Sequence, residues 1–433
     1  MEWAYILFFA IVFLFALLMP GLWIAIALGV TGILGLIITG NINHISTLGN
    51  ISWNTSNDFI LTAIPLFLFM GEVILVSGIS KKFYTSIGKW LSKVPGGLLH
   101  TNILATGIFS AISGSSVATA AGIGSVAIPE MKKRGYKKSL IYGSIASGGT
   151  LGILIPPSIV LILYGAMTET SIVRLFAAAI LPGIILMVLF LIYTGSVMVK
   201  KNNQVSGEIT EEITIIRSIL NVFPLVLLIV LVLGSLYTGL VTPTEAAAVG
   251  SLFAIIICYA FGDLNIRKIY MATKNAIRTT SMLLFIMIGA QIFSFALVRS
   301  GVNRQLTAWI GESMFSPLVL LLVICVIYIV LGFFMDGPSI LLLTLPLLFP
   351  VVMEAGYNPI WFGIVLVILI ELGQITPPMG LNLFVIKGID PSSNIGEIVK
   401  GTFPYCIIMI VMLAMLIIFP DIALRFAESI SLR

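Results

Sequence analysis

Long runs of hydrophobic residues, separated by short polar turns, follow one another along almost the whole chain. A run of about 20 mainly apolar residues is long enough to cross a bilayer as a helix. The pattern predicts helices at about 4–19, 21–40, 59–77, 138–165, 173–199, 217–238, 244–262, 276–298, 359–388 and 402–424. This succession of apolar helices indicates an all-α polytopic membrane protein.

Two further apolar regions, 97–131 and 315–353, are interrupted near their middles. The interruptions read ISGSSVAT and FMDGPSIL, and each divides its region into two arms of about half the length needed to span. We therefore expect each region to form a re-entrant hairpin, which enters and leaves the membrane on the same side.

Two of the predicted spans contain a double proline, in LGILIPPS (151–158) and LGQITPPM (372–379). Each proline removes a backbone donor and clashes with the preceding helical turn. Irregular backbone at membrane depth is tolerated where it is buried in protein or lines a cavity. We therefore expect two broken helices, 138–165 and 359–388, that help to form a binding site.

The two double prolines lie 221 residues apart, and other matches recur at that offset. Pro129 corresponds to Pro350, and the Gly-Tyr pair at 135–136 corresponds to the pair at 356–357. The matches predict two repeats, each made of a helix, an interfacial arm, a hairpin and a broken helix. The expected division is 1–58 for N-terminal scaffold helices, 59–172 for repeat 1, 173–275 for linking scaffold helices, 276–388 for repeat 2 and 389–433 for a C-terminal helix.

Basic residues fix the expected orientation in the membrane. With the two hairpins counted as re-entrant, 18 of the 23 lysines and arginines fall on one side, which the positive-inside rule makes cytoplasmic. The other five are Arg174, Arg299, Arg304, Arg425 and Arg433. This pattern predicts that the repeats are inverted relative to each other, an arrangement typical of secondary transporters. It also places both termini outside the cytoplasm and makes Arg299 and Arg304 either interfacial anchors or docking points for an acidic partner.

Composition narrows the class of function further. Of the 433 residues 59% are hydrophobic and 9% charged, whereas about 25% are charged in soluble domains. The net charge of +5 follows the topology and does not indicate nucleic-acid binding. The three cysteines have no ligand-like spacing, and neither a nucleotide loop nor an H-E-x-x-H motif is present. An ATP-driven pump and a membrane metalloprotease are therefore not supported.

Small polar residues gather at the breaks. Gly114, Ser115 and Ser116 lie at the first hairpin tip, Gly149 and Thr150 precede the first break, and Gln374 and Thr376 lie within the second. Hydroxyls and free carbonyls suit a hard cation such as sodium, and the N-termini of half-helices suit a carboxylate. For the threonines, a hydrogen bond to the carbonyl four residues earlier is the structural alternative.

Three acidic residues, Glu72, Asp336 and Glu371, lie within apolar segments, where ionisable groups are costly and commonly functional. Asp336, at the second tip, would bind a cation, cap the following half-helix or pair with a residue on the other side of the gap between the tips. Glu371 would act similarly or form a structural hydrogen bond, and Glu72 is expected to be structural. Glu245 follows Thr242-Pro243-Thr244 and is expected to cap a helix.

An enzyme is the competing class of function. A membrane hydrolase using Ser115 or Ser116 needs a base nearby, but the only histidines are His44 and His100. His100 lies about 20 Å from the tip if the intervening arm is helical. We therefore expect no enzymatic activity. A channel is also disfavoured, because two opposed hairpins indicate alternating access.

Long stretches of the chain resemble the large membrane subunit of tripartite ATP-independent periplasmic (TRAP) transporters: SGSSVATAAGIGSVAIPEMKKRGY, ASGGTLGILIPPSIVLILYG, MDGPSILLLTLPLLFPV and GQITPPMGLNLF. The resemblance implies an elevator-type importer in the bacterial inner membrane, driven by a sodium gradient and moving an organic acid such as a C4-dicarboxylate or sialic acid. It also implies a small four-helix membrane subunit and a periplasmic substrate-binding protein as partners. No four-helix extension precedes the first segment, so the small subunit is expected to be a separate polypeptide.

The resemblance also implies site residues and no cofactor besides Na⁺. One sodium site would involve Gly114, Ser115, Ser116, Gly149 and Thr150. A second sodium site would involve Asp336, Gly337, Thr376 and Met379. Substrate would lie near Ser116, Thr119, Pro156, Pro157 and Pro378. A stand-alone sodium/dicarboxylate carrier of the elevator type, without a binding protein, is the alternative.

Overall fold

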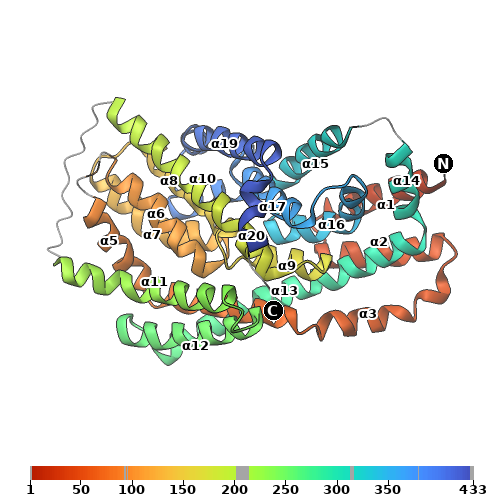
Figure 1. Ribbon diagram of the computed structural model, residues 1–433, viewed down its shortest axis with the longest axis horizontal. Helices are drawn as coiled ribbons and strands as arrows, with labels where there is room; N and C mark the ends of the chain where they lie inside the picture. Colours follow the sequence, from red (N-terminus) through yellow and green to blue (C-terminus); the bar gives the residue numbers. More distant parts are fainter. Residues whose placement is uncertain are drawn as a thin grey trace.

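The computed structural model describes residues 2–91, 94, 96–200, 214–312, 316–378 and 380–429, and in these residues every regular element is a helix (Figure 1). In chain order they are α1 (Glu2–Leu18), α2 (Ile24–Ile38), η1 (Ile42–His44), α3 (Thr47–Ser56), η2 (Ile60–Thr62), α4 (Ala63–Val76), α5 (Ile79–Leu91), α6 (Leu98–Ser113), α7 (Ser116–Lys133), α8 (Lys138–Leu154), α9 (Ile159–Thr168), α10 (Ile172–Lys200), α11 (Ile215–Tyr237), α12 (Pro243–Phe261), α13 (Ile266–Arg299), α14 (Val302–Glu312), α15 (Pro317–Gly332), α16 (Gly337–Glu354), α17 (Pro359–Ile375), α18 (Leu381–Ile389), α19 (Ile395–Ile418) and α20 (Asp421–Ser429). The expected all-α membrane fold is confirmed.

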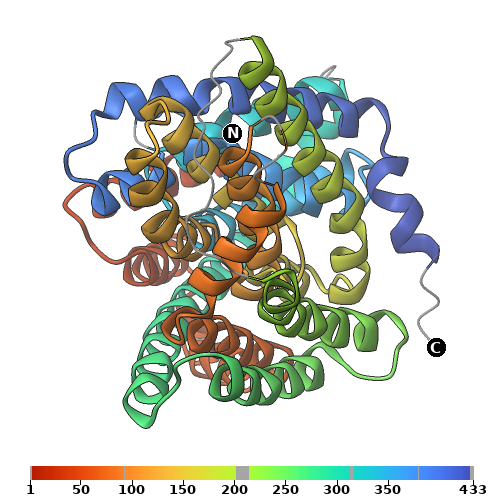
Figure 2. The same cartoon turned by 90° about the vertical axis from the view of Figure 1, so that its left-hand side faces the viewer.

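The helices form two groups. α3, α11, α12 and α13 lie along the lower side of Figure 1, and Figure 2 shows the same layer below the remaining helices. Within this layer α13 packs along α2, and α4 packs against both α12 and α13. We call α2–α4 and α11–α13 the scaffold, and α6–α10 with α15–α20 the hairpin body. The arms α5 and α14 connect the two groups along the chain.

Seven helices of the described chain are long and apolar enough to cross a membrane, or eight if the bent pair Ile42–Ser56 and Ile60–Val76 is counted as one span. The predicted spans at 4–19 and 21–40 are helical, but α1 has 17 residues and α2 has 15, fewer than the roughly 20 of a perpendicular span. Helix α3 was not predicted, because its ten residues, TLGNISWNTS, are largely polar.

Two predicted helix starts are wrong. α13 begins at Ile266 rather than 276, because Asn265 caps it and accepts a hydrogen bond from Lys268 N at 2.9 Å. α19 begins at Ile395 rather than 402, because Asn394 caps it in the same manner. The expected single C-terminal helix is in fact two, α19 and α20. Polar first turns extend a helix beyond the apolar run that predicts it.

The interruptions predicted from the sequence are present. Region 97–131 forms α6 and α7 with a break at Gly114–Ser115, and region 315–353 forms α15 and α16 with a break at 333–336. The double prolines separate α8 from α9 and α17 from α18. The order and the lengths of the elements recur: α6 and α15 have 16 residues each, α7 and α16 have 18, and α8 and α17 have 17.

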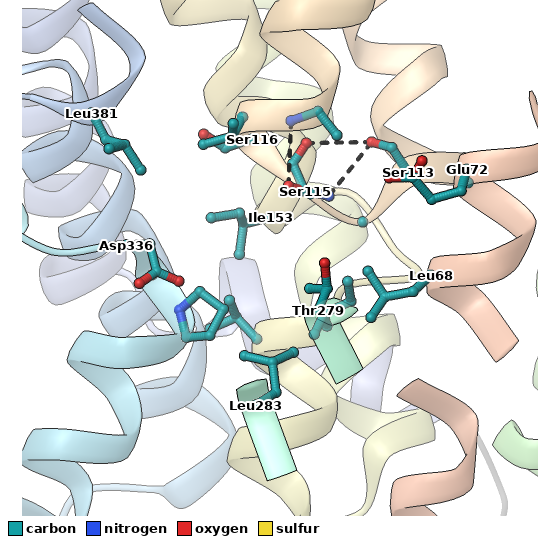
Figure 3. Close-up of a pocket in the computed structure, with 18 of the residues that line it drawn as sticks. Leu68, Glu72, Ser113, Ser115, Ser116, Ile153, Thr279, Leu283, Asp336 and Leu381 are labelled. Atoms are coloured by element: carbon teal, nitrogen blue, oxygen red, sulfur yellow. Dashed lines mark hydrogen bonds between the residues drawn. The ribbon is translucent and has the colours of Figure 1, made fainter. Parts of the chain in front are cut away.

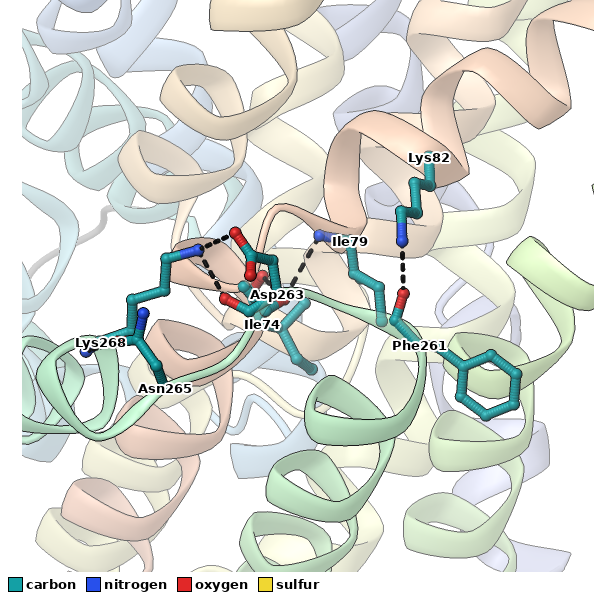
Figure 4. Close-up of polar contacts among 8 residues, drawn as sticks. Ile74, Ile79, Lys82, Phe261, Asp263, Asn265 and Lys268 are labelled. Carbon is teal, nitrogen blue, oxygen red and sulfur yellow. Dashed lines mark hydrogen bonds and ion pairs between the residues drawn. The ribbon is translucent and has the colours of Figure 1, made fainter.

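A polar joint ties the scaffold to the first arm (Figure 4). Asp263, in the loop between α12 and α13, donates its backbone N–H to the Ser77 carbonyl at 2.9 Å. Lys82 of α5 donates to the Phe261 carbonyl at 2.8 Å, and Lys268 pairs with the Asp263 carboxylate at 3.0 Å. Because the Asp263–Ser77 and Lys82–Phe261 contacts connect the α4–α5 corner with the end of α12 and the loop after it, arm and scaffold are joined at one end.

The second hairpin lies directly on the second broken helix through two glycines. A Cβ at Gly373 of α17 would lie 2.7 Å from the Gly332 Cα of α15, and a Cβ at Gly332 would lie 2.6 Å from the Gly373 Cα. Only glycine permits backbones to approach this closely. The pair therefore fixes the position of the hairpin against the residues that precede the break.

We predict that Gly373→Ala destabilises the protein by about 1–3 kcal/mol, because the new methyl group meets backbone that has no room to move. Thermal unfolding of the purified protein measures the effect. Gly234→Ala is the matched control, since nothing lies within 4 Å of a Cβ at that position of α11. Equal melting temperatures for the two variants would contradict the packing described.

A polar cluster around Asp390 joins repeat 1 to the segment that follows α18. Asp390 forms an ion pair with Lys132 of α7 and accepts hydrogen bonds from Tyr142 Oη and Ser392 Oγ, each at 2.6 Å. Burial by itself raises the pKa of Asp390, but the bonds from Lys132, Ser392 and Tyr142 outweigh it and hold the pKa well below its usual range. The ionised form therefore stabilises the contact between the first hairpin and the segment that follows α18.

Asp390→Asn is expected to destabilise the protein by about 1–3 kcal/mol at pH 7, because it removes a charge that has three donors. A carboxyl group whose pKa is lower in the folded state contributes stability above its unfolded pKa of about 3.9 and loses it as the pH falls further. The difference in melting temperature between wild type and variant should therefore narrow below about pH 4. Asp263→Asn, at an exposed ion pair, is the control and should change stability by less than about 1 kcal/mol. A difference that stays constant at acid pH would rule out this account.

Candidate functional site

A cavity of about 460 Å³ lies between the scaffold and both hairpin tips (Figure 3). Glu72 of α4 and Thr279 of α13 border it from the scaffold. In Figure 3 the side chain of Ser116, from the first tip, lies above Ile153, and that of Asp336, from the second tip, lies to its left. The cavity thus touches both repeats and both groups of helices.

The first tip is built by a glycine and a serine. Gly114 ends α6 in the left-handed region, with φ +58°, which favours glycine. Ser115 is the N-cap of α7, and its hydroxyl accepts a hydrogen bond from Ala118 N at 3.4 Å. The carbonyl end of one half-helix and the amide end of the next therefore meet at this tip, and these ends favour a cation and an anion respectively.

The first tip packs against the residues around the first break. A Cβ at Gly152 would lie 2.8 Å from the Ser115 carbonyl oxygen, and one at Gly149 would lie 3.2 Å from the Ser116 carbonyl oxygen. Gly114 approaches the Pro157 carbonyl in the same way, at 3.0 Å. The structure thus brings the predicted residues Gly114, Ser115, Ser116 and Gly149 together.

The predicted threonines have hydrogen bonds within their own helices. Thr150 Oγ1 donates to the Ser147 carbonyl at 2.6 Å, and Thr376 Oγ1 donates to the Leu372 carbonyl at 2.5 Å. A hydroxyl that donates its proton keeps its lone pairs, so these bonds do not prevent cation binding. Thr376 lies 3.8 Å from Cys406 Sγ of α19 and does not border the cavity.

The second tip places an acid at the start of a helix. Asp336 occupies the N-cap position of α16, with Gly337 as the first helical residue. Within the described chain Asp336 has no basic partner within 4 Å, so the pairing considered from the sequence is not formed. Met379, the remaining predicted residue of this site, lies outside the described residues.

Of the residues predicted to surround the substrate, Ser116 borders the cavity. Thr119 is fully buried, and its hydroxyl lies 2.6 Å from that of Ser113. Pro156, Pro157 and Pro378 form the two breaks and do not border this cavity. The structure therefore places Ser116, and not the prolines, at the cavity.

Two amide side chains complete the site. Ser116 Oγ lies 2.7 Å from Gln374 Oε1 and 3.0 Å from Asn382 Oδ1, and all three residues are buried. Sequence reasoning noted Gln374 only as part of the break and missed Asn382. The available signal was an amide within the apolar segment GLNLF, because polar groups at membrane depth commonly serve a function.

Acidic side chains border the cavity. Glu72 and Asp336 both border it, and its described lining includes no lysine, arginine or histidine. Glu72, expected to be structural, also accepts a hydrogen bond from Asn275 Nδ2 at 2.9 Å. Arg278 borders a second cavity of about 880 Å³, which shares Thr279, Met282 and Asp336 with the first. An ionised carboxylate at either position would repel an anion in this cavity unless cations accompany it.

Glu371 of α17 is fully buried opposite the first broken helix. Its Oε1 accepts a hydrogen bond from Ile153 N at 3.1 Å, and its Oε2 has no partner among the described residues. Glu371 does not border the cavity. Of the two alternatives left by the sequence, the geometry favours a structural hydrogen bond between the repeats.

Comparisons with known proteins show which family this chain resembles. Residues 11–422 match the model of the family described as "Tripartite ATP-independent periplasmic transporter, DctM component". The chain is 34% identical to the C4-dicarboxylate TRAP transporter large permease protein DctM of Pseudomonas aeruginosa, over 92% of this chain and 93% of that protein. It is 31% identical to the isethionate TRAP transporter permease protein DctMQ of Oleidesulfovibrio alaskensis, over 95% of this chain and 64% of that protein.

A solved structure shares the fold. The YdaH transporter of Alcanivorax borkumensis, described as having an unusual topology, superposes with a TM-score of 0.63. The alignment covers 89% of this chain and 90% of that chain at 17% identity, so the likeness concerns the fold alone.

The free energy of unfolding of Glu371→Gln is expected to lie within about 1 kcal/mol of the wild-type value, because the amide keeps an acceptor for Ile153 N. Glu371→Ala is expected to cost about 2–4 kcal/mol, because it also leaves a hole in a close-packed interface. Thermal unfolding with and without sodium chloride measures both changes. A glutamine variant as unstable as the alanine variant, and insensitive to sodium, would show that Glu371 carries a required charge instead.

Proposed function

The chain belongs to the DctM-component family of tripartite ATP-independent periplasmic transporters, and we propose that it is the large membrane subunit of a sodium-driven importer of a small organic anion. Its relatives are named as transporter permeases, for C4-dicarboxylates in one case and isethionate in another. The shared chemistry of these compounds is a small organic skeleton with a carboxylate or sulfonate group.

The proposal of sodium coupling rests on the acidic side chains that border the cavity. Two carboxylates, Glu72 and Asp336, border the space between the tips, and no basic side chain of the described lining balances them. Binding an organic anion there adds further negative charge in a medium of low dielectric constant. Bound sodium ions would remove that repulsion, so that anion and cation bind more strongly together than apart.

The proposed ion sites follow the two tips. The first comprises Gly114, Ser115, Ser116, Gly149 and Thr150, and it is supported by the packing of the first tip on α8. The second comprises Asp336, Gly337, Thr376 and Met379, and it is supported by the carboxylate at the N-cap of α16. Oxygen ligands from carbonyls, hydroxyls and a carboxylate suit a hard cation. Na⁺ is proposed as the coupling ion, and no other cofactor is invoked.

The proposed substrate position lies between the amide ends of α7 and α16. Backbone N–H groups at the start of a helix bind anions without introducing a basic side chain. Ser116 would contact the substrate directly, while Thr119, Pro156, Pro157 and Pro378 would shape the surrounding tips and breaks.

The proposed mechanism is an elevator movement of the hairpin body against the scaffold. The cavity lies at the boundary of the two groups, with Glu72 and Thr279 on the scaffold side. Three helices of spanning length, α10, α11 and α12, separate the repeats. If each crosses once, this odd number inverts the second repeat relative to the first, as alternating access to a central site requires.

We propose the bacterial inner membrane as the location, with both termini on the periplasmic side. The proposed partners are a small membrane subunit, fused to the large one in the DctMQ relative, and a periplasmic substrate-binding protein. Arg299 and Arg304 would lie on the side that faces the binding protein, and Arg299 lies 5.2 Å from the ring of Phe295.

Uptake into proteoliposomes tests the function. With the small subunit and the binding protein present, labelled succinate or isethionate is expected to accumulate only under an inward sodium gradient. Asp336→Asn is expected to lower this uptake at least about tenfold, because it removes the only charged ligand proposed for an ion. Asp263→Asn, which changes an exposed aspartate, is the control. Uptake without sodium would contradict the coupling, and sodium-driven uptake without the binding protein would favour the stand-alone carrier.

A further inference from the structure

The second cavity, of about 880 Å³, differs from the first in the charge of its lining. Arg278 of α13 borders it and is the one basic residue of its described lining. Thr279, Met282 and Asp336 border both cavities, so the two spaces adjoin beside α13 and the second tip. Thr279 and Asp336 are labelled in Figure 3. An anion that leaves the first cavity on this side therefore enters a space that holds a basic side chain.

The guanidinium group of Arg278 is free to bind a ligand. Among the described residues it has no carboxylate partner within 4 Å, although Asp336 borders the same cavity. A guanidinium group presents its N–H donors in one plane and can bind an oxyanion group through two parallel hydrogen bonds. Thr279 and Ser281 add hydroxyl groups to the same lining. The second cavity is therefore suited to a carboxylate or sulfonate group.

Arg278 marks one boundary of the membrane-spanning part of α13. Residues 279–298 carry no charge, and at 1.5 Å per residue they cover about 30 Å, the thickness of the hydrocarbon core. Arg267 and Lys274 precede Arg278 on the same helix, so the positive-inside rule assigns this end to the cytoplasm. Trp23, which is 71% exposed and typical in type of a membrane boundary, also borders the cavity. The second cavity therefore lies on the proposed cytoplasmic side of the site.

We propose that the second cavity is an anion-binding site on the release route of the transported anion, in which Arg278 binds the carboxylate or sulfonate group. The inference rests on the proposed function and deepens it by naming a basic residue for the anion, which the described lining of the first cavity lacks. The residues shared by the two cavities favour the transported anion over a lipid phosphate as the occupant, because a lipid has no need of access to the first cavity.

The position of Arg278 on the scaffold suits release. In the proposed elevator movement the hairpin tips move with the anion and its cations, whereas α13 stays in place. Arg278 is therefore near the anion only in the arrangement described here, in which Asp336 of the second tip borders both cavities. A basic residue on a tip would travel with the anion and compete with a cation for Asp336. The guanidinium group attracts the anion out of the first cavity without adding positive charge to the proposed ion sites.

Protection of a cysteine in the second cavity tests the inference. The three native cysteines are buried, so Ser281→Cys, at an exposed position of the lining, supplies the reactive thiol. Succinate, isethionate or sialic acid, added in sodium chloride to the protein with its small subunit, is expected to slow labelling by a neutral maleimide. Adding Arg278→Gln should raise the concentration needed for half-protection about tenfold or more, because a charge-assisted hydrogen bond is lost.

Arg267→Gln, added to Ser281→Cys, is the matched control. It removes the same charge from the same end of α13, but Arg267 borders neither cavity. Arg267 lies about 16 Å from Arg278 along the helix, which is beyond the Debye length of roughly 8 Å at physiological salt. Its half-protection concentration should therefore stay within about twofold of that of Ser281→Cys alone.

Two results of the labelling experiment would overturn the inference. One is protection that Arg278→Gln leaves unchanged or that Arg267→Gln weakens equally. The other is labelling that no anion of the panel slows but that added anionic phospholipid slows, because this result assigns the site to a lipid phosphate.

Uptake distinguishes failure of this inference from failure of the proposed function. In the proteoliposome assay Arg278→Gln is expected to lower the maximal rate about threefold or more without raising the KM, because release and not capture is slowed. If the wild type shows no sodium-driven uptake, the proposed function fails, yet protection that depends on Arg278 still supports the anion site. Uptake by Arg278→Gln at the wild-type rate overturns the place of this site on the release route.

Discussion

The need to satisfy backbone polar groups at membrane depth governs the arrangement of the hairpin body. Each interruption of a helix exposes carbonyl and amide groups that hydrocarbon cannot solvate. The chain meets this constraint by packing interruptions against one another: Gly114 approaches the Pro157 carbonyl, and Gly152 approaches that of Ser115. Glycines allow the backbone segments to approach this closely. The polar atoms that border the cavity lie at the same contacts.

The cavity links this constraint to transport. Helix ends that face each other across a small space offer both carbonyl oxygens and amide hydrogens, which suit a cation and an anion respectively. Glu72 and Asp336 add negative charge from the scaffold and from the second tip. The proposed coupling of anion transport to sodium follows from this charge balance, because an anion binds favourably there only when cations are bound as well.

The sequence predicted most of the helices correctly but placed the starts of some of them wrongly. The hairpins and broken helices were predictable because an apolar run with Gly, Ser or Pro–Pro at its middle has few stable structures in a membrane. The starts of α13 and α19 were not, because Asn265 and Asn394 cap polar first turns that no hydropathy pattern includes. Helix α3 was not predicted for the same reason, since six of the ten residues of TLGNISWNTS are Thr, Asn or Ser.

The sequence by itself determined the class of protein, the interruptions of its helices and several residues that border the cavity, including Ser116 and Asp336. Only the tertiary structure decided which of these meet. The bond between Ser116 and Gln374 joins residues 258 positions apart, and the one between Ser116 and Asn382 joins residues 266 apart. The local sequence pattern determines how a single segment folds. Contacts between the repeats depend instead on how the helices pack. Small residues such as Gly337 and Gly373 allow this close packing but do not determine which helices meet.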